Sequence, residues 1–135
     1  MPSPPLTRRE YAYFSATGDG SPDIITRVLG EPSQSWAVGD PGPGGPRKFM
    51  RWKLESGLDD TEPLEKHIES LLAILEPKSS ALQHLMPSYH LTLQCVGYYP
   101  ASGHGAHFDR DAVRRVASLG LAIDLDFYYV DDPHE

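Results

Sequence analysis

The chain has 135 residues, which fits one domain, because single hydrophobic cores commonly hold about 100–150 residues. Its formal net charge of −7 argues against a nucleic-acid partner, which needs a concentrated basic surface, and suits a basic protein partner. The single cysteine, Cys95, excludes an internal disulfide and predicts a reducing, cytoplasmic location. No apolar run approaches the roughly 20 residues that cross a bilayer, so we expect no membrane association.

The first predicted element is a strand over residues 11–17, which shows the two-residue alternation of a pleated sheet. Three prolines precede it and predict an extended or disordered N-terminus over residues 1–10. After the strand, Ser21 is the expected cap of a short helix that has Pro22 at its first position. Gly30 supplies the stop of this helix.

The segment 35–38 completes a first β-α-β unit and leads into a tract, 40–46, in which six of seven residues are proline or glycine. This composition excludes a helix or an inner strand, and the spacing and hydroxyl of a phosphate-binding loop are missing. We therefore expect a mobile hairpin connection, followed by a strand over 49–56. The inward face of that strand carries Met50, Trp52 and Leu54, and its outward face carries Arg51, Lys53 and Glu55.

The middle of the chain contains the longest predicted helix. Asp60 or Thr61 is its expected cap, Pro63 lies in its first turn, and Pro77 must end or bend it because proline has no amide proton. A second helix over 78–85 follows. Apolar residues recur along the first helix at helical spacing and are assigned to the core. They are Leu64, Ile68, Leu71, Leu72 and Leu75.

A second β-α-β unit is predicted at the C-terminal end. It consists of a strand over 89–99, a helix capped by Asp109, and a strand over 122–130. The sequence therefore predicts an α+β fold with a single antiparallel or mixed sheet of four to five strands. Helices pack on one face of this sheet, in a ferredoxin-like or related arrangement. The domain spans residues 11–130, and residues 131–135 form an acidic tail.

Helices on one face leave the other face of the sheet to solvent. The alternation assigns charged, polar and phenolic side chains to that face, and tyrosine and arginine are favoured anchors at protein interfaces. The sequence therefore predicts a protein-binding surface made of this face and the 40–48 loop. Its candidate residues are Trp36, Arg47, Lys48, Arg51, Lys53, Asp124 and Asp126. An exposed sheet edge also allows pairing with a second copy as a homodimer.

One group of residues has the composition of a metal site. His104, His107 and Asp109 are of the types that bind zinc or iron. However, Asp109 is already required as a helix cap, and no second rigid element clearly supplies another ligand. We therefore predict neither a metal nor another cofactor, and these three residues remain weak candidates.

A pair of carboxylates on the last strand is open to two interpretations. Asp124 and Asp126 share one strand face, about 7 Å apart by the strand rise. Two acids at this spacing suit general acid–base chemistry. They equally suit ion pairs across the sheet with Arg51 and Lys53, which is the usual fate of charges on an exposed face, and we favour this structural interpretation.

The remaining thiol and imidazole groups are not assigned a function. Cys95 lies in the middle of a strand among leucines, where a thiol is expected to be buried and inert rather than a nucleophile. His67 and His84 lie on predicted helices beside charged or polar residues, and we expect both to be solvated.

Four short motifs occur along the chain in a fixed order and spacing. They are Ser35-Trp36-x-x-Gly39-Asp40, Trp52-x-Leu54-x-Ser56-Gly57-Leu58, Leu64-Glu65-x-His67-x-x-x-Leu71-Leu72-x-x-Leu75-Glu76-Pro77-Lys78 and Leu119-Gly120-x-x-Ile123-Asp124-Leu125-Asp126. With these motifs the chain resembles, from Tyr11 to Tyr129, the bacterial family called domain of unknown function 4279. The resemblance implies a small, single-domain, bacterial and cytosolic protein. Because no activity is established for the family, the resemblance implies no catalytic residues.

Three functions remain open from the sequence. The leading hypothesis is a non-enzymatic protein-binding module, and one concrete version, by analogy with other small acidic single-domain proteins, is an immunity-type protein that blocks a toxin. The second hypothesis is a small metal-dependent enzyme centred on the 101–109 loop. The third is a domain that binds a small ligand between the sheet and the 101–109 loop.

Overall fold

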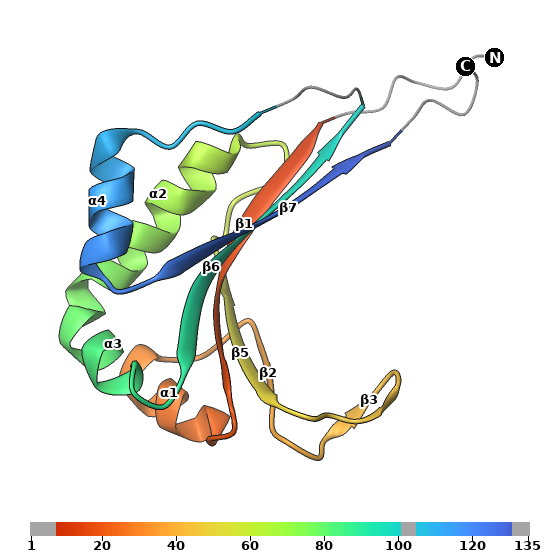
Figure 1. The fold of residues 1–135 in the computed structure, drawn as a ribbon, viewed down its shortest axis with the longest axis vertical. Coiled ribbons are helices and arrows are strands. Elements are labelled where there is room, and N and C mark those ends of the chain that lie inside the picture. Colours follow the sequence, from red (N-terminus) through yellow and green to blue (C-terminus); the bar gives the residue numbers. More distant parts are fainter. Residues whose placement is uncertain (1–7, 101–104, 131–135) are drawn as a thin grey trace.

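The computed structural model describes residues 8–100 and 105–130 and contains a five-stranded sheet with helices along one face (Figure 1). The predicted α+β class and the one-sided helical layer are confirmed. The sheet contains β1 (Arg9–Gly18), β2 (Gln34–Trp36), β5 (Met50–Glu55), β6 (His90–Tyr99) and β7 (Ala122–Tyr129). The helices are α1 (Pro22–Leu29), α2 (Leu64–Leu75), α3 (Ser79–Leu85) and α4 (Arg110–Ser118). The predicted acidic tail, 131–135, lies outside the described residues.

The strand order is β2-β5-β1-β6-β7, and every neighbouring pair is antiparallel except β6 with β7. β5 lies between β1 and β2, so the first β-α-β unit is split by a later strand. The strands β2-β5-β1-β6, with the helices that connect them, form the β-α-β-β-α-β arrangement of ferredoxin-like folds. The second β-α-β unit adds α4 and places β7 parallel to β6 at the edge.

A continuous core fills the space between the sheet and the helices. The predicted apolar stripe of α2 is completely or almost completely buried. Trp52 is also fully buried, as its inward position predicted, and meets the ring of Phe14 edge-on at a centroid distance of 5.9 Å. The Trp52 indole Nε1–H donates to Thr26 Oγ1 at 3.0 Å. The polar atom of this large core residue is therefore satisfied, and the hydrogen bond ties β5 to α1.

The ends of α1 and α4 agree with the sequence. Ser21 Oγ accepts a hydrogen bond from Asp23 N at 3.1 Å, and Gly30 ends α1 at a positive φ of 97°. Asp109 Oδ1 accepts from Ala112 N at 2.8 Å and so caps α4. Both short helices therefore begin where side-chain oxygens satisfy the free amides of the first turn.

The start of α2 differs from the prediction. Pro63 occupies the capping position, and neither Asp60 nor Thr61 caps the helix with its side chain. The N–H and the hydroxyl of Thr61 instead donate to Asp59 Oδ1, at 2.9 and 2.8 Å, within the turn before the helix. A local aspartate turn therefore takes the role that the prediction gave to a cap. At the other end, Pro77 bends the chain as expected, through a 3₁₀ helix (Glu76–Lys78) between α2 and α3.

The proline- and glycine-rich tract forms a small hairpin of β3 (Pro41–Gly42) and β4 (Gly45–Pro46). Its base is closed by two backbone hydrogen bonds between Asp40 and Arg47 and between Gly39 and Arg47, both of 2.8 Å. The hairpin projects from the side of the sheet opposite the helices (Figure 1). The predicted hairpin connection is thus confirmed.

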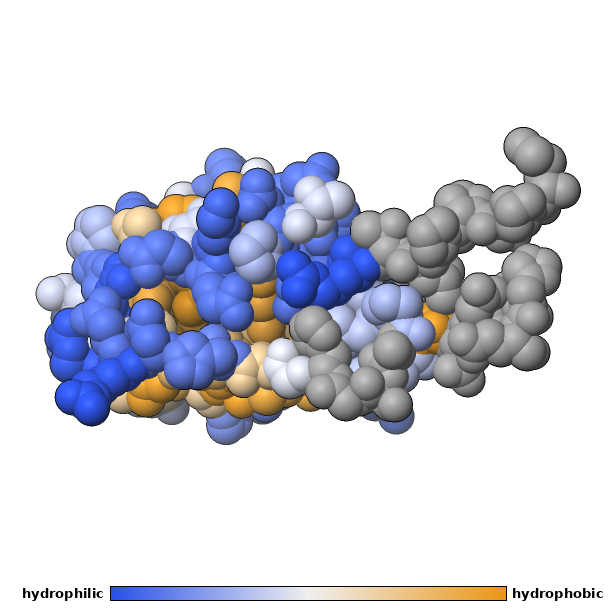
Figure 2. All heavy atoms as spheres, turned by 90° about the horizontal axis from the view of Figure 1, so that it is seen from above, coloured by the Kyte–Doolittle hydropathy of each residue, from blue (hydrophilic) through white to orange (hydrophobic). Residues whose placement is uncertain are grey.

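The surface of the molecule is mainly polar where it is seen from above. Hydrophilic residues cover most of the described surface in this view, and hydrophobic residues show in strips between them (Figure 2). Within residues 8–100 and 105–130, no helix combines the length and the apolar composition needed to cross a membrane.

Candidate functional site

The side of the sheet away from the helices carries one continuous set of outward side chains. Residues that pair across neighbouring strands share a face, so the register decides which side chains lie together. This set is named the open face. It consists of Gln34 and Trp36 on β2, Arg51, Lys53 and Glu55 on β5, Arg9, Tyr11, Tyr13, Ser15 and Thr17 on β1, His90, Thr92, Gln94, Val96 and Tyr98 on β6, and Ala122, Asp124, Asp126 and Tyr128 on β7.

Five of the candidate binding residues lie on the open face, and the other two adjoin it. Trp36, Arg51, Lys53, Asp124 and Asp126 are brought to the same side of the sheet by the register. Arg47 and Lys48 directly follow the β3–β4 hairpin, and Arg47 packs against Trp36. Their role in binding remains a prediction, but their placement makes a common surface available.

Charged residues of the open face lie on three strands. Arg51, Lys53 and Glu55 lie on β5, Arg9 lies on β1, and the acidic pair, Asp124 and Asp126, lies on β7 at the edge. The expected ion pairs of Asp124 and Asp126 with Arg51 and Lys53 are therefore wrong. Because β1 and β6 lie between β5 and β7, the two groups are roughly 14 Å apart at the usual strand spacing. The face therefore has a basic, arginine-bearing end at β2 and β5, where Lys53 Nζ lies 3.9 Å from Glu55 Oε1, and an acidic end at β7.

The basic end is organised around one indole. The Arg47 guanidinium lies 3.9 Å from the centroid of the Trp36 ring, and that of Arg51 lies 5.8 Å away. The indole Nε1–H donates to the backbone carbonyl of Phe49 at 3.2 Å, which holds the ring in place. We name these residues, Trp36, Arg47 and Arg51, the arginine–tryptophan cluster. Its cation–π contacts keep two long side chains ordered at the surface.

Tyrosines occupy the centre of the open face. The Lys53 ammonium lies 4.1 Å from the centroid of the Tyr13 ring. Partial burial raises the pKa of Tyr13, while the positive charge of Arg51 acts in the opposite direction. Burial likewise raises the pKa of Tyr11, with a further contribution from neighbouring Tyr98. These phenols therefore stay neutral at pH 7 and act as hydrogen-bonding groups with large apolar rings.

The acidic end combines carboxylates with stacked rings. Gln94 Nε2 donates to Asp126 Oδ2 at 2.6 Å, so one carboxylate is oriented by β6. Tyr98 and Tyr128 stack with their centroids 5.1 Å apart and their planes at 18°. The guanidinium of Arg9 lies 5.4 Å from the centroid of Tyr98. Aromatic area thus continues from the centre of the face to its acidic edge.

A groove of about 440 Å³ adjoins the open face where β1 and β5 meet the loop that leads into α2. Charged groups of both signs line it. Its lining residues include Arg9, Tyr11, Lys53, Ser56 and Asp60. Arg9 Nε donates to Asp60 Oδ2 at 2.7 Å across the groove. The space is large enough for a small polar ligand.

A buried serine–histidine pair lies at the floor of this region. The Ser56 hydroxyl and His67 Nδ1 are 2.6 Å apart, and His67 Nε2 lies 3.2 Å from the carbonyl oxygen of Glu62. Because that carbonyl only accepts, Nε2 carries the proton, and in the neutral ring Nδ1 accepts from Ser56. Ser56 Oγ also accepts from Leu58 N at 3.2 Å.

The expected solvation of His67 is therefore wrong, because its side chain is completely buried. The residue lies on the inward side of α2, where it replaces an apolar residue and fastens the helix to the end of β5. His84, in contrast, is exposed as expected, and its Nδ1 lies 2.8 Å from the carbonyl oxygen of Ser80 one turn earlier.

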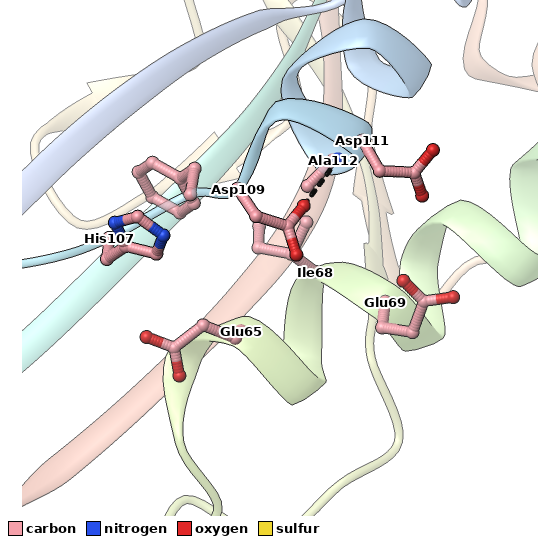
Figure 3. Close-up of a pocket in the computed structure, with 8 residues that line it drawn as sticks. Glu65, Ile68, Glu69, His107, Asp109, Asp111 and Ala112 are labelled. Carbon is pink, nitrogen blue, oxygen red and sulfur yellow. Dashed lines mark hydrogen bonds between the residues drawn. The ribbon is translucent and has the colours of Figure 1, made fainter.

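The described part of the proposed metal site does not form a cluster. His107 and Asp109 line a cavity of about 100 Å³ between α2 and the start of α4 (Figure 3). Asp109 uses Oδ1 to cap α4, and Figure 3 shows the imidazole of His107 lying to one side of that carboxylate. Among the described residues, no group of three or more histidine, cysteine, aspartate or glutamate side chains is placed to hold a metal ion. His104 lies outside the described residues.

Glu69, which lines this cavity, and Glu76 beyond it serve a structural purpose. Arg115 Nη1 donates to Glu69 Oε2 at 2.7 Å, and Nε and Nη2 donate to the two carboxylate oxygens of Glu76 at 3.0 and 2.6 Å. This network joins α4 to α2 and to the 3₁₀ helix that follows it.

Cys95 is buried on the helical side of the sheet, as predicted. Burial raises the pKa of its thiol to about 12, and the negative charge of Asp124 acts in the same direction. A thiol with such a pKa holds its proton at neutral pH, which does not suit a nucleophile.

Sequence analysis did not predict three features of the structure: the groove, the buried Ser56–His67 pair and the stacked tyrosines. The alternation of β6 and β7 does carry a signal for the stack, because Tyr98 and Tyr128 are both outward residues near the ends of neighbouring strands. The other two depend on where a loop folds over the sheet, and no local pattern indicates them.

A family model described as domain of unknown function (DUF4279) matches residues 8–130. The chain therefore belongs to this family, as its motifs suggested. No curated protein and no solved structure matches the chain.

Proposed function

We propose that this member of the DUF4279 family is a non-enzymatic module that binds a protein partner through its open face. The observation that carries the proposal is a five-stranded face without a helical cover, on which aromatic side chains lie between a basic and an acidic end. A small acidic domain with such a face suits an immunity-type protein, and this is the concrete version of the proposal.

The chemistry of the face supports recognition of a protein. Tyrosine, tryptophan and arginine supply most of the binding energy at protein interfaces, because they bury large areas while keeping polar groups available. The open face holds all three types, and their rings are already packed against cations or against each other. Little side-chain entropy would be lost on binding. The two charged ends would fix the orientation of the partner.

The size of the face supports inclusion of the neighbouring loops. Five strands of these lengths offer roughly 600 Å² at ordinary strand spacings, whereas a standard interface buries about 800 Å² on each partner. The β3–β4 hairpin and the loop beside the groove border the face and supply the remaining area. We therefore expect contacts from the hairpin as well as from the strands.

Site-specific photocrosslinking in lysate of the native host tests the proposal. A photoreactive phenylalanine replaces Tyr128 or Gln34, which are exposed at opposite edges of the open face. Val113, exposed on α4, provides the matched position on the helical side. We expect one adduct of the same mass from both open-face positions and none from Val113.

A charge reversal sharpens this experiment. With Asp124→Lys and Asp126→Lys combined in the crosslinking variants, the adducts should decrease strongly, since the acidic end would then repel its counterpart on the partner. Adducts of equal yield from Val113 would contradict the proposal. The absence of any adduct from both Tyr128 and Gln34 would contradict it as well.

The groove supports a second candidate, a domain that binds a small polar ligand. Its volume of about 440 Å³ lies in the range of small-molecule sites, whereas the cavity near His107 has only about 100 Å³. A thermal-shift screen against metabolites tests this candidate, because a bound ligand raises the unfolding temperature by mass action. A specific shift should disappear in Tyr11→Ala; a screen without any shift argues against the candidate.

A further inference from the structure

The glycine-rich hairpin has a steric connection to the basic end of the open face. A Cβ atom added at Gly42 would lie 2.6 Å from Nε and 2.8 Å from Cδ of Arg47. The Arg47 side chain therefore crosses the hairpin directly over Gly42 and continues onto the ring of Trp36. A side chain at position 42 would occupy that path. The backbone conformation at position 42 accepts a side chain, so the consequence of adding one there is displacement of the Arg47 guanidinium end.

Within residues 8–100 and 105–130, the two guanidinium groups of the arginine–tryptophan cluster have no anionic partner. In the described part of the chain, neither Arg47 nor Arg51 forms a hydrogen bond or an ion pair through its side chain, and Nε of each is buried without a partner. Asp40 is the acid next to the hairpin, and its Oδ2 accepts the amide of Ala37 at 2.8 Å. Two fixed positive charges thus remain without compensation in a chain of net charge −7.

We propose that the arginine–tryptophan cluster binds carboxylate side chains of an acidic segment on the protein partner. The inference rests on the proposed function, because it names the chemistry that the basic end of the open face recognises. With Nε of each arginine turned into the packing, the terminal nitrogens are left to form paired hydrogen bonds with a carboxylate. Exposed Lys48 adds positive charge on the same side, whereas half-buried Lys53 is paired with Glu55 at 3.9 Å.

An acidic protein segment fits this site better than a nucleic acid. Tight nucleic-acid binding needs many phosphate contacts along an extended basic surface. Here the basic residues form one end of a face whose other end carries Asp124 and Asp126, which would repel a polyphosphate chain. A short run of glutamates or aspartates needs only the local charge, and its own backbone can follow the edge of β2.

A titration followed by NMR tests the inference on the full chain. The probe is a synthetic peptide of alternating glutamate and alanine, with the glutamine–alanine peptide as its control. The readout is the indole N–H signal of Trp36, distinguished from that of the other tryptophan with Trp36→Phe. We expect a saturable shift with the glutamate peptide and none with the glutamine peptide.

Variants separate the effect of the two placed guanidinium groups on peptide binding from the effect of net charge. Arg47→Gln combined with Arg51→Gln should weaken peptide binding roughly tenfold or more. Arg27→Gln combined with Arg110→Gln changes the net charge equally on exposed helical positions and should leave affinity almost unchanged. Gly42→Ala keeps every charge but displaces Arg47, whose flexible end can move without unfolding the chain, and should weaken binding several-fold.

The outcomes separate this inference from the proposed function. Equal affinity of the parent chain and the Arg47/Arg51 variant overturns the inference, as does a Trp36 shift with an oligonucleotide but not with the glutamate peptide. If crosslinking from Tyr128 and Gln34 succeeds in the same preparation, the proposed function stands while the inference fails. If both experiments fail, both are wrong.

Discussion

The two faces of the sheet are built from alternate residues of the same strands, yet they have opposite surroundings. On β5, Trp52 is completely buried beneath the helices, while its neighbours Arg51 and Lys53 lie half-buried on the open face. On β1, Phe14 belongs to the core and Tyr13 supports the ammonium of Lys53. A single-residue alternation thus separates side chains that stabilise the fold from side chains that are available for recognition.

Arginines show the same contrast between the two sides. Arg115, on the helical side, is held by Glu69 and Glu76 and joins two helices. Arg47 and Arg51, at the open face, pack on an aromatic ring and have no carboxylate partner among the described residues. The first arrangement uses the charge within the fold, and the second leaves it without a carboxylate among the described residues, where the proposed acidic segment would bind. Substitutions on the two sides should therefore separate stability from binding.

The largest expected effect is the loss of a core side chain on the helical side. Leu72→Ala removes a completely buried residue of α2 and should lower the free energy of unfolding by about 2–5 kcal/mol. Tyr128→Ala removes a larger side chain that is 48% exposed on the open face, and should cost about 1 kcal/mol or less. Urea unfolding followed by circular dichroism measures both. Equal losses would contradict the division between the faces.

A smaller effect is expected from the buried histidine. His67→Ala leaves the hydroxyl of Ser56 without its acceptor and should lower the free energy of unfolding by about 1–3 kcal/mol. His84→Ala, an exposed position on α3, is the matched control and should change it by less than about 0.5 kcal/mol. Urea unfolding midpoints of the two variants measure this difference. Similar midpoints would show that the Ser56–His67 contact does not stabilise the fold.

The smallest effect depends on pH. The hydrogen bond from Arg115 holds the pKa of Glu76 below its usual value of 4.5. A lowered carboxylate pKa contributes stability above about pH 4.5 and loses it as the pH falls through the folded-state value. Arg115→Gln should thus lower the urea midpoint at pH 7, and its difference from the parent chain should shrink in acid.

The matched variant on the open face, Arg51→Gln, should show no such dependence of stability on pH. Arg51→Gln removes a guanidinium without a carboxylate partner among the described residues, so the urea midpoint at pH 7 should stay close to that of the parent chain. A decrease as large as that of Arg115→Gln would mean that the arginine–tryptophan cluster stabilises the fold rather than remaining available for a ligand.

Local patterns in the sequence were sufficient for the elements and for the faces they present. The helical spacing of leucines predicted the buried side of α2, and Asp109 predicted the start of α4. The period-two alternation assigned Arg51, Lys53, Asp124 and Asp126 to one side of a sheet. These properties follow from chain geometry within a few residues, because helices and strands repeat over 3.6 and 2 residues. The family resemblance was also visible, because it rests on motif order.

Only the tertiary structure decided which of these residues meet. The strand order placed β1 and β6 between the basic and the acidic residues and so prevented the expected ion pairs. Packing of the loop before α2 buried His67 against Ser56, and the hairpin laid Arg47 across Gly42 onto Trp36. Contacts of this kind depend on register and on how separate segments pack. Alternation is the same for every strand order, so it carries no information about them.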